Sequence, residues 1–262
     1  MAPSFRIPPH VERELAFSKL IAKGARGRPA KRVQEWVSIH GFRTPVDSDF
    51  GSATEHAVVA FQESRKLKPT GRVDKATWTL LVEPLARAVG PVPLPPGASG
   101  ARAVLAVARH HLKEHPIEVG GENCGPWVRA YMNGNEGRDW KWCAGFVTFV
   151  LRQAYALIGQ PPPIKGSFSC DSLAAQARDR SLFVSEAEMK KKSPNWSGLG
   201  DSMIFLVRRT PMDWIHTGFA FAFEDQGFTT IEGNTNSEGG RDGYEVCSQS
   251  RGFGKKDFIS LP

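Results

Sequence analysis

The sequence predicts two domains, a small all-α domain followed by an α+β domain with an antiparallel sheet. The length of 262 residues suits two domains. A stretch rich in Pro and Gly, which can sustain neither a helix nor a central strand, interrupts the chain at residues 88–100. Helical patterns precede this stretch, and strand patterns end the chain. We therefore expect a first domain over residues 1–87, a linker over 88–100 and a second domain over 101–262.

Helical patterns cover most of the first domain. Apolar residues at helical spacing predict one helix over residues 15–21 and another around residues 33–37. Ser52, with Glu55 three residues later, has the spacing of a capping box for a third helix. Asp74 is expected to cap a short last helix. The first domain is therefore expected to be a small helical bundle.

Two helices and then several strands are predicted after the linker. Apolar spacing predicts helices over residues 101–112 and 143–157. From residue 201 onward, short apolar runs alternate with Gly, Asp and Asn turns. The expected strands cover residues 202–208, 215–223, 228–232, 244–248 and 257–260. Helices first and strands later are typical of an α+β domain with an antiparallel sheet.

Charge and hydropathy narrow the range of partners. The net charge is +7, and residues 1–90 hold fifteen Lys and Arg against nine Asp and Glu. A basic first domain favours an anionic polymer: nucleic acid, a membrane surface or cell-wall glycan. Nucleic acid is disfavoured because the chain has no reader motif and no basic stripe interleaved with aromatic residues. No apolar run is long enough for a transmembrane helix or a signal peptide, so we expect no membrane insertion.

The cysteines and histidines do not predict a metal site. The sequence holds four cysteines, Cys124, Cys143, Cys170 and Cys247. None belongs to a Cys-x-x-Cys pair, which disfavours structural zinc. His111 and His115 have helical spacing without the Glu of a metalloprotease motif, so two solvated side chains at a helix end are expected. Apart from Cys143, the thiols are expected to stay reduced, with one disulfide as the alternative.

Cys143 is the candidate nucleophile. It lies at the predicted start of an apolar helix, where the helix dipole favours thiolate; a buried inert thiol is the alternative interpretation. His216 lies near the start of a predicted strand in which every second residue is Phe. It is either the base for this thiol or a core residue. Glu232 and Asn234, two residues apart on the next strand, either orient the imidazole or form a polar turn.

Four motifs in the second domain resemble, in this order, the CHAP family of papain-like cysteine amidases and peptidases that cleave peptidoglycan. They are Trp-Cys-Ala-Gly-Phe-Val at 142–147, Gly-Asp-Ser-Met-Ile-Phe at 200–205, Ile-His-Thr-Gly-Phe at 215–219 and Ile-Glu-Gly-Asn-Thr at 231–235. The resemblance implies a papain-like fold and a reaction without a cofactor. It also implies that Cys143 is the nucleophile and His216 the base. Glu232 and Asn234 would be the pair that orients the imidazole.

The first domain resembles the three-helix peptidoglycan-binding domain over residues 15–85. The residues that carry this resemblance include Val33, Gln34, Asp49, Phe50, Gly51, Ala57, Val58, Phe61, Gln62, Gly71, Thr77 and Trp78. Ser48, Thr70 and Asp74 depart from the family pattern, and all three are turn positions. The resemblance implies peptidoglycan as the partner of the first domain.

Together the two resemblances imply a peptidoglycan hydrolase that cleaves an amide bond in the stem peptide or at the glycan–peptide link. One alternative is a wall-binding protein without activity, and another is a cytosolic transferase or deamidase on the same scaffold. Without a signal peptide, the chain is expected to reach the cell wall or periplasm by release or by injection. A holin would serve a phage lysin, and an immunity protein would accompany an injected effector. We expect a monomer.

Overall fold

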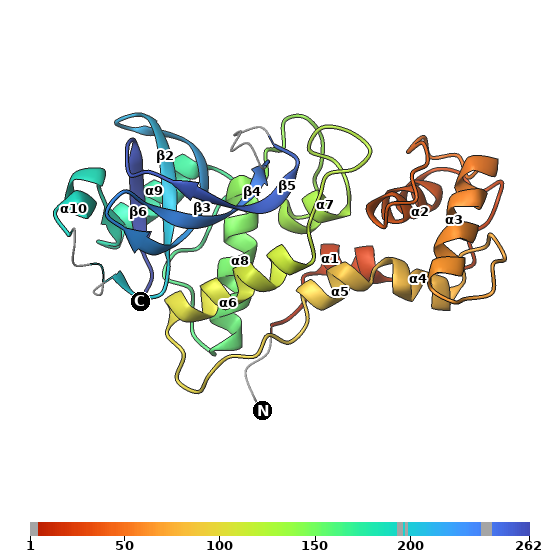
Figure 1. Ribbon diagram of the computed structural model, residues 1–262, viewed down its shortest axis with the longest axis horizontal. Helices are drawn as coiled ribbons and strands as arrows, with labels where there is room; N and C mark the ends of the chain where they lie inside the picture. The colour runs from red at the N-terminus through yellow and green to blue at the C-terminus, as the bar shows by residue number, and fades with distance from the viewer. Residues whose placement is uncertain (1–4, 193–195, 197–198, 237–242) are drawn as a thin grey trace. The chain divides into compact units, whose positions relative to one another are not determined.

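The computed structural model describes residues 5–192, 196, 199–236 and 243–262 (Figure 1). The chain forms two compact units. The helical unit comprises Ile7–Ala88 and Ile117–Trp140. The sheet unit comprises Val89–Pro116 and Lys141–Pro262 together with the described residues before Ile7.

The segment Ile117–Trp140 departs from the expected domain boundaries. The sequence places it after the linker, in the second domain, whereas the structure packs it within the helical unit. Trp127 is fully buried there, with its ring 6.3 Å from that of Trp36. Arg129 of the same segment pairs with buried carboxylates of the helical unit. A Pro-rich linker indicates where the chain leaves a compact unit. It does not indicate that a later segment of the chain packs back into the same unit.

The helical unit is built from short helices. They are α1 (Pro9–Leu15), α2 (Arg28–Ile39), α3 (Ser52–Ser64), α4 (Lys75–Leu81), α5 (Glu83–Ala88) and α7 (Pro126–Tyr131). Pro29 stands in the first turn of α2, where its missing N–H leaves no partner unsatisfied. Val33, Trp36 and Val37 then form the buried face of this helix, as their spacing predicts.

The helix predicted over residues 15–21 is wrong. The helix in this region, α1, begins earlier and ends at Leu15. Pro9 starts it, because proline already has the backbone angle of a first helical turn. Ile21 instead forms an isolated antiparallel bridge with Val73. Its burial therefore comes from a contact far along the chain, and helical spacing alone could not separate the two cases.

Of the two helix caps predicted in the helical unit, one is present and the other is not. Asp74 accepts a hydrogen bond of 2.8 Å from the backbone N–H of Thr77 and caps α4, as predicted. The capping box at Ser52 and Glu55 is wrong, since Gly51 is the N-cap of α3 and Ser52 is already its first helical residue. The helix begins one residue earlier than the box requires, so no side chain caps it.

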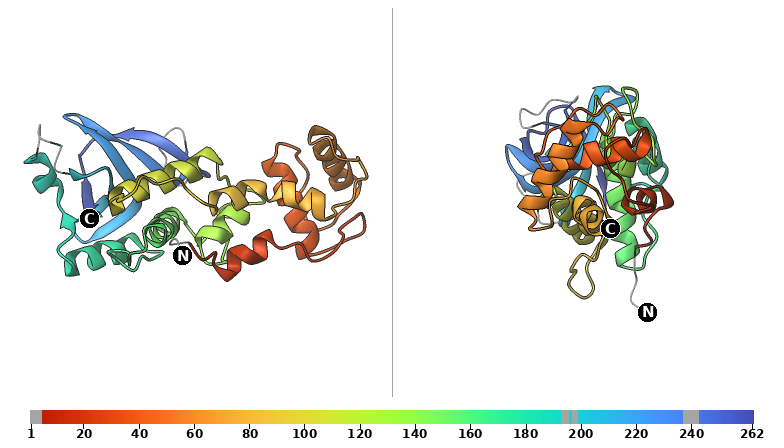
Figure 2. Two further views of the ribbon diagram at one scale, coloured as in Figure 1. Left: turned by 90° about the horizontal axis from the view of Figure 1, so that it is seen from below. Right: turned by 90° about the vertical axis from the view of Figure 1, so that its right-hand side faces the viewer.

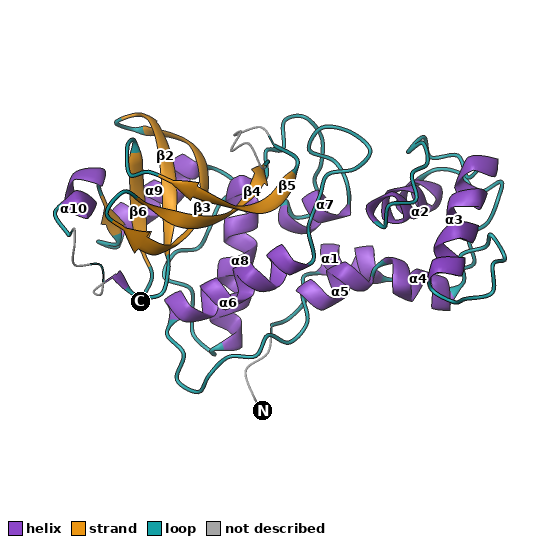
Figure 3. Cartoon of the chain, viewed as in Figure 1, coloured by secondary structure: helices purple, strands orange, loops and turns teal. Residues whose placement is uncertain are grey.

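An antiparallel sheet forms the centre of the sheet unit (Figure 3). Its strands are β1 (Phe183–Val184), β2 (Met203–Thr210), β3 (Asp213–Glu224), β4 (Gly227–Thr235), β5 (Glu245–Arg251) and β6 (Lys256–Ser260). They follow the order β1-β6-β2-β3-β4-β5. Each expected strand is present, which confirms the helix-then-strand division of this part of the chain.

Helices flank this sheet. They are α6 (Gly100–Lys113), α8 (Cys143–Leu157), α9 (Cys170–Asp179) and α10 (Glu186–Lys190). The first two were predicted, whereas α9 and α10 were not. Figure 2 shows α8 alongside the sheet, where it packs against β3, β4 and α6. The rings of Phe146 and Phe219, 5.9 Å apart, join α8 to β3. This packing brings the first turn of α8 to the sheet.

Candidate active site

Cys143 is the first residue of α8 and keeps only 6% of its surface exposed. Cys170, the first residue of α9, hydrogen-bonds to its sulfur and lowers the pKa of the Cys143 thiol. Burial opposes this shift, but His216 and the backbone N–H of Ala144 lower the pKa further. The pKa of Cys143 therefore lies well below its ordinary value, and the pKa of Cys170 well above it. Within this pair, Cys143 is therefore the more acidic thiol.

His216 lies on β3 and is 1% exposed. Its Nε2 lies 2.7 Å from Oε2 of Glu232, on the neighbouring strand. Its Nδ1 is buried and makes no hydrogen bond of good geometry within the described residues, so this nitrogen is left for the thiol. Burial alone would lower the pKa of His216, but Cys143 and Glu232 raise it to about 9. A low thiol pKa beside a high imidazole pKa favours a thiolate–imidazolium pair at neutral pH.

Glu232 is fully buried on β4, yet it is ionised at neutral pH. Burial would raise the pKa of its carboxyl, but hydrogen bonds from Arg251 and His216 lower it to about 2. Thr230 also donates its hydroxyl to Oε1, at 2.6 Å. A buried carboxylate is stable only when its oxygens are paired in this way.

Arg251 is a part of this site that the sequence analysis missed. Its Nε lies 2.5 Å from Oε1 of Glu232, and its Nη2 lies 2.6 Å from Oε2. This two-pronged contact fixes the carboxylate as well as neutralising it. Arg251 ends β5, where it stands opposite Phe228 of β4. Only strand pairing brings it to Glu232, and no motif in the sequence pointed to it.

Two glycines make room for these side chains. A Cβ added at Gly218 of β3 would lie 2.9 Å from Cγ of Glu232. A Cβ added at Gly233 of β4 would lie 2.8 Å from Cβ of Phe146 and 2.9 Å from Cζ3 of Trp142. Both distances are shorter than ordinary contacts, so the site depends on close backbone approach at these two positions.

Asn234 has a different role from the one expected. It adopts a left-handed backbone conformation, with φ of 55°, and the register of β4 with β5 shifts at this point. Its Oδ1 accepts a 2.7 Å hydrogen bond from the backbone N–H of Trp142, and its Nδ2 donates to the carbonyl of Gly243. The structure thus brings Cys143, His216 and Glu232 together, while Asn234 holds the backbone before α8 and does not contact the imidazole by a hydrogen bond within the described residues.

The remaining histidines and cysteines differ in their surroundings. Cys247 of β5 stands opposite Glu232 in the pairing of β4 with β5, whereas Cys124 belongs to the helical unit. His115 is exposed, as expected. His111, by contrast, is fully buried, and burial lowers its pKa to about 4, so the expectation of a solvated side chain is wrong for this residue. Its Nε2 lies 2.9 Å from Oε1 of Gln153, a contact between two helices that spacing within one helix does not reveal. All four cysteines are free thiols in the structure. No cluster of three His, Cys, Asp or Glu suited to a metal ion occurs among the described residues.

Comparison with known families identifies one part of the chain. Residues 26–81 match the family model of the peptidoglycan binding domain, and this stretch contains α2, α3 and α4. The helical unit carries a peptidoglycan-binding domain. This domain associates the chain with the cell wall. No curated protein matches the sequence. In the part of the chain that the structure describes, no helix is both long and apolar enough to cross a membrane.

Proposed function

We propose that this chain is a peptidoglycan hydrolase, in which the sheet unit cleaves an amide bond and the peptidoglycan-binding domain holds the wall. One observation carries the proposal. A thiol with a lowered pKa, an imidazole with a raised pKa and an ionised carboxylate meet at the start of a buried helix. The same three residues belong to the motifs that resemble the CHAP family, which supports a papain-like arrangement of helix and sheet.

The first half of the proposed reaction forms an acyl-enzyme. The thiolate of Cys143 attacks the carbonyl carbon of the amide, and a C–S bond forms while the carbonyl oxygen gains negative charge. The backbone N–H of Cys143, at the start of α8, is the donor placed to stabilise this oxygen. His216 gives its proton to the amide nitrogen as the C–N bond breaks. The amine leaves, and a thioester and a neutral imidazole remain.

The second half releases the acid. Neutral His216 removes a proton from water as the water oxygen attacks the thioester carbonyl. The C–S bond breaks, Cys143 leaves as thiolate, and His216 is again the imidazolium. Glu232 stays ionised throughout, because Arg251 and His216 hold the pKa of its carboxyl at about 2. No cofactor takes part in the proposed steps.

The proposed place of action is the cell wall or periplasm, reached by release or injection. Binding of the polymer by one domain raises the local concentration of substrate for a catalytic unit on the same chain. A lysin that passes a holin pore and an injected effector with an immunity protein are the two proposed settings.

The Cys143→Ala variant tests the proposed activity. We expect release of soluble muropeptides from isolated sacculi to fall by about three orders of magnitude or more, since the nucleophile is lost. The melting temperature should hardly change, because Ala is close to Cys in size. Cys124→Ala, which replaces a thiol of the helical unit, is the matched control and should keep full activity. Mass spectrometry of the products identifies the amide that is cleaved.

Three outcomes would contradict the proposal. A folded wild-type chain that binds sacculi but releases nothing would be a wall-binding protein without activity. A chain active on small amides but never on sacculi would fit the transferase or deamidase alternative. A fully active Cys143→Ala variant would place the nucleophile elsewhere.

A further inference from the structure

A half-open pocket of about 300 Å³ lies in the helical unit. Its walls come from α1, the loop that follows α1, α2 and α4. The side chains that matter for its chemistry are Arg13, Phe17, Ile21, Arg28, Arg32 and Trp78. The first three precede residues 26–81, the stretch that matches the peptidoglycan-binding family. The pocket is therefore completed by a part of the chain outside the family match.

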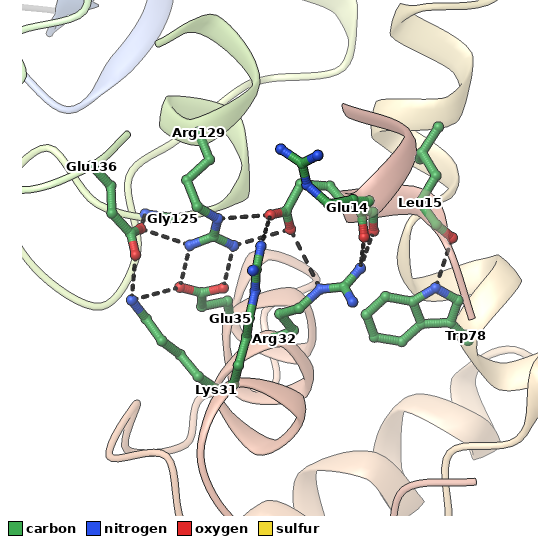
Figure 4. A network of polar contacts seen from close by, with 11 residues as sticks. Glu14, Leu15, Lys31, Arg32, Glu35, Trp78, Gly125, Arg129 and Glu136 are labelled. Atoms are coloured by element: carbon green, nitrogen blue, oxygen red, sulfur yellow. Dashed lines mark hydrogen bonds and ion pairs between the residues drawn. The ribbon is translucent and has the colours of Figure 1, made fainter. Parts of the chain in front are cut away.

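Arg32, which lines this pocket, is held in place before any ligand arrives. Arg32 donates from Nη2 to the backbone carbonyl of Arg13, at 2.7 Å, and its guanidinium lies 4.5 Å from the centre of the Trp78 ring. Trp78 is itself fixed by a 2.8 Å hydrogen bond from Nε1 to the carbonyl of Leu15 (Figure 4). The Nε of Arg32 is buried and lies 3.5 Å from Oε2 of Glu14, an ion pair without the geometry of a hydrogen bond. A guanidinium fixed in this way loses little freedom when it binds an anion.

The pocket has more positive than negative charge. Glu14 is its nearest carboxylate, 3.5 Å from both Arg28 and Arg32. The same carboxylate also bonds Arg129, at 2.8 Å, so its single charge is shared among three arginines. Arg13 has no ion pair among the described residues and is exposed. An excess of guanidinium groups beside an apolar wall favours an anionic ligand.

We propose that this pocket binds a free carboxylate of the peptidoglycan stem peptide, with the apolar wall of Phe17 and Ile21 against the aliphatic part of the same residue. The inference rests on the wall-binding part of the proposed function and names the ligand group. Guanidinium groups match carboxylates through paired N–H donors. A neutral sugar ring fits less well, because Trp78 is only 2% exposed and Arg32 covers its ring.

Calorimetric titration of the full chain tests this proposal. The chain carries Cys143→Ala, so that binding is measured without turnover whether or not the sheet unit is a hydrolase. The ligands are a soluble stem peptide with free carboxylates and the same peptide with its carboxylates amidated. The pocket variant is Arg13→Gln with Arg28→Gln, and the matched control is Arg26→Gln with Arg43→Gln. All four arginines are exposed and lie in the helical unit, and both pairs remove two positive charges.

We expect the pocket variant to bind the free peptide about tenfold more weakly or worse, since charge-assisted hydrogen bonds to the carboxylate are lost. The control should stay within about twofold of the parent. The amidated peptide should bind the parent weakly and should not distinguish the variants. Equal losses in both variants would overturn the proposal in favour of general charge attraction, as would equal affinity for the amidated peptide. A pocket variant that still sediments with sacculi and binds the peptide normally would overturn the pocket while leaving wall association intact.

Discussion

Glu232 and Arg251 act on the imidazole of His216 in opposite directions. The negative charge of Glu232 raises the pKa of His216, at a distance of 2.7 Å between Oε2 and Nε2. Arg251 lies on the same carboxylate and partly cancels that charge. In the proposed reaction Arg251 is therefore a positioning residue, which acts only through Glu232. The balance between the two charges sets the pH at which the imidazolium is lost.

The wild-type activity should follow a bell-shaped pH profile. The acid limb reports the lowered pKa of the Cys143–His216 pair, and the alkaline limb lies near pH 9, where the imidazolium loses its proton. His216→Ala should flatten this profile and leave almost no rate, with an unchanged circular dichroism spectrum. A folded His216→Ala variant with near-normal turnover would assign the proton transfer to another group.

Two substitutions should move the alkaline limb in opposite directions. Glu232→Gln keeps a hydrogen-bond acceptor but removes the charge, so the limb should move down by roughly one pH unit or more. Arg251→Gln leaves the carboxylate charge uncancelled, so the limb should move up while kcat falls through loss of orientation. Arg251→Lys, which keeps the charge, should restore the position of the limb more than the rate.

The exposed Arg209→Gln serves as the control for charge, and its limb should stay in place. Profiles of kcat/KM on a soluble muropeptide provide the measurement. If both substitutions moved the limb downward, Glu232 would act only by hydrogen bonding and the assigned role of Arg251 would be wrong.

At the scale of elements, the site depends on how closely β4 approaches α8. Gly233 allows the strand to lie against Phe146 and Trp142, and the next residue, Asn234, bonds the backbone N–H of Trp142. The start of α8, and with it Cys143, is thus held by two consecutive residues of one strand. The strand must break its regular register to do this, which explains the positive φ of Asn234.

Gly233→Ala should therefore damage both stability and activity. The new Cβ would meet Phe146 at 2.8 Å, and moving a packed helix away costs roughly 1–3 kcal/mol of the free energy of unfolding. Cys143 would move with the helix, so kcat/KM should fall as well. Gly254→Ala is the matched control, since nothing lies within 4 Å of its new Cβ. Denaturant unfolding and muropeptide kinetics measure the two effects, and an unchanged Gly233→Ala variant would mean that α8 is not held by β4.

At the scale of the whole molecule, a buried charge network ties the segment Ile117–Trp140 into the helical unit (Figure 4). Arg129 contacts carboxylate oxygens of Glu14, Glu35 and Glu136 at 2.6–2.8 Å. Lys31 adds a contact with Glu136 at 2.5 Å. Burial raises the pKa of Glu35 even though Arg129 bonds it, so this carboxylate depends on the guanidinium.

Deletion of residues 1–90 would disrupt this charge network. A chain that lacked residues 1–90 would leave Arg129 without two of its three carboxylates and would expose Trp127, which is now fully buried. Its loss of activity would report misfolding of Ile117–Trp140 as much as loss of wall binding. Substitution of Arg13 and Arg28, which line the pocket of the helical unit, therefore tests wall binding more directly than deletion of residues 1–90 does.

Arg129→Gln should destabilise the helical unit by about 3 kcal/mol or more at neutral pH, because it leaves buried carboxylates unpaired. The loss should shrink as pH falls, since burial raises the pKa of Glu35 and its carboxyl then becomes protonated and neutral. Arg138→Gln, which removes an exposed arginine of the same segment, should leave the melting curve unchanged. Thermal unfolding across pH provides the measurement. A loss that does not depend on pH would mean that packing, and not the paired charge, is what Arg129 contributes.

Much of the local structure could be predicted from the sequence by itself. Periodicity placed α6, α8 and the strands of the sheet, because core-facing side chains must recur at the period of their own element. Short motifs also placed Cys143, His216 and Glu232, whose types and order along the chain suit a nucleophile, a base and an orienting acid. The residues that match the peptidoglycan-binding family were visible in the same way.

Only the tertiary structure decided the rest. It assigned Ile117–Trp140 to the helical unit and showed that Asn234 bonds the backbone before α8. It also showed that His111 is buried beside Gln153 and that Arg251 pairs with Glu232. In each case the deciding partner lies far away in the sequence. Such partners are selected by packing and by the need to pair every buried charge, and neither requirement leaves a periodic or local trace along the chain.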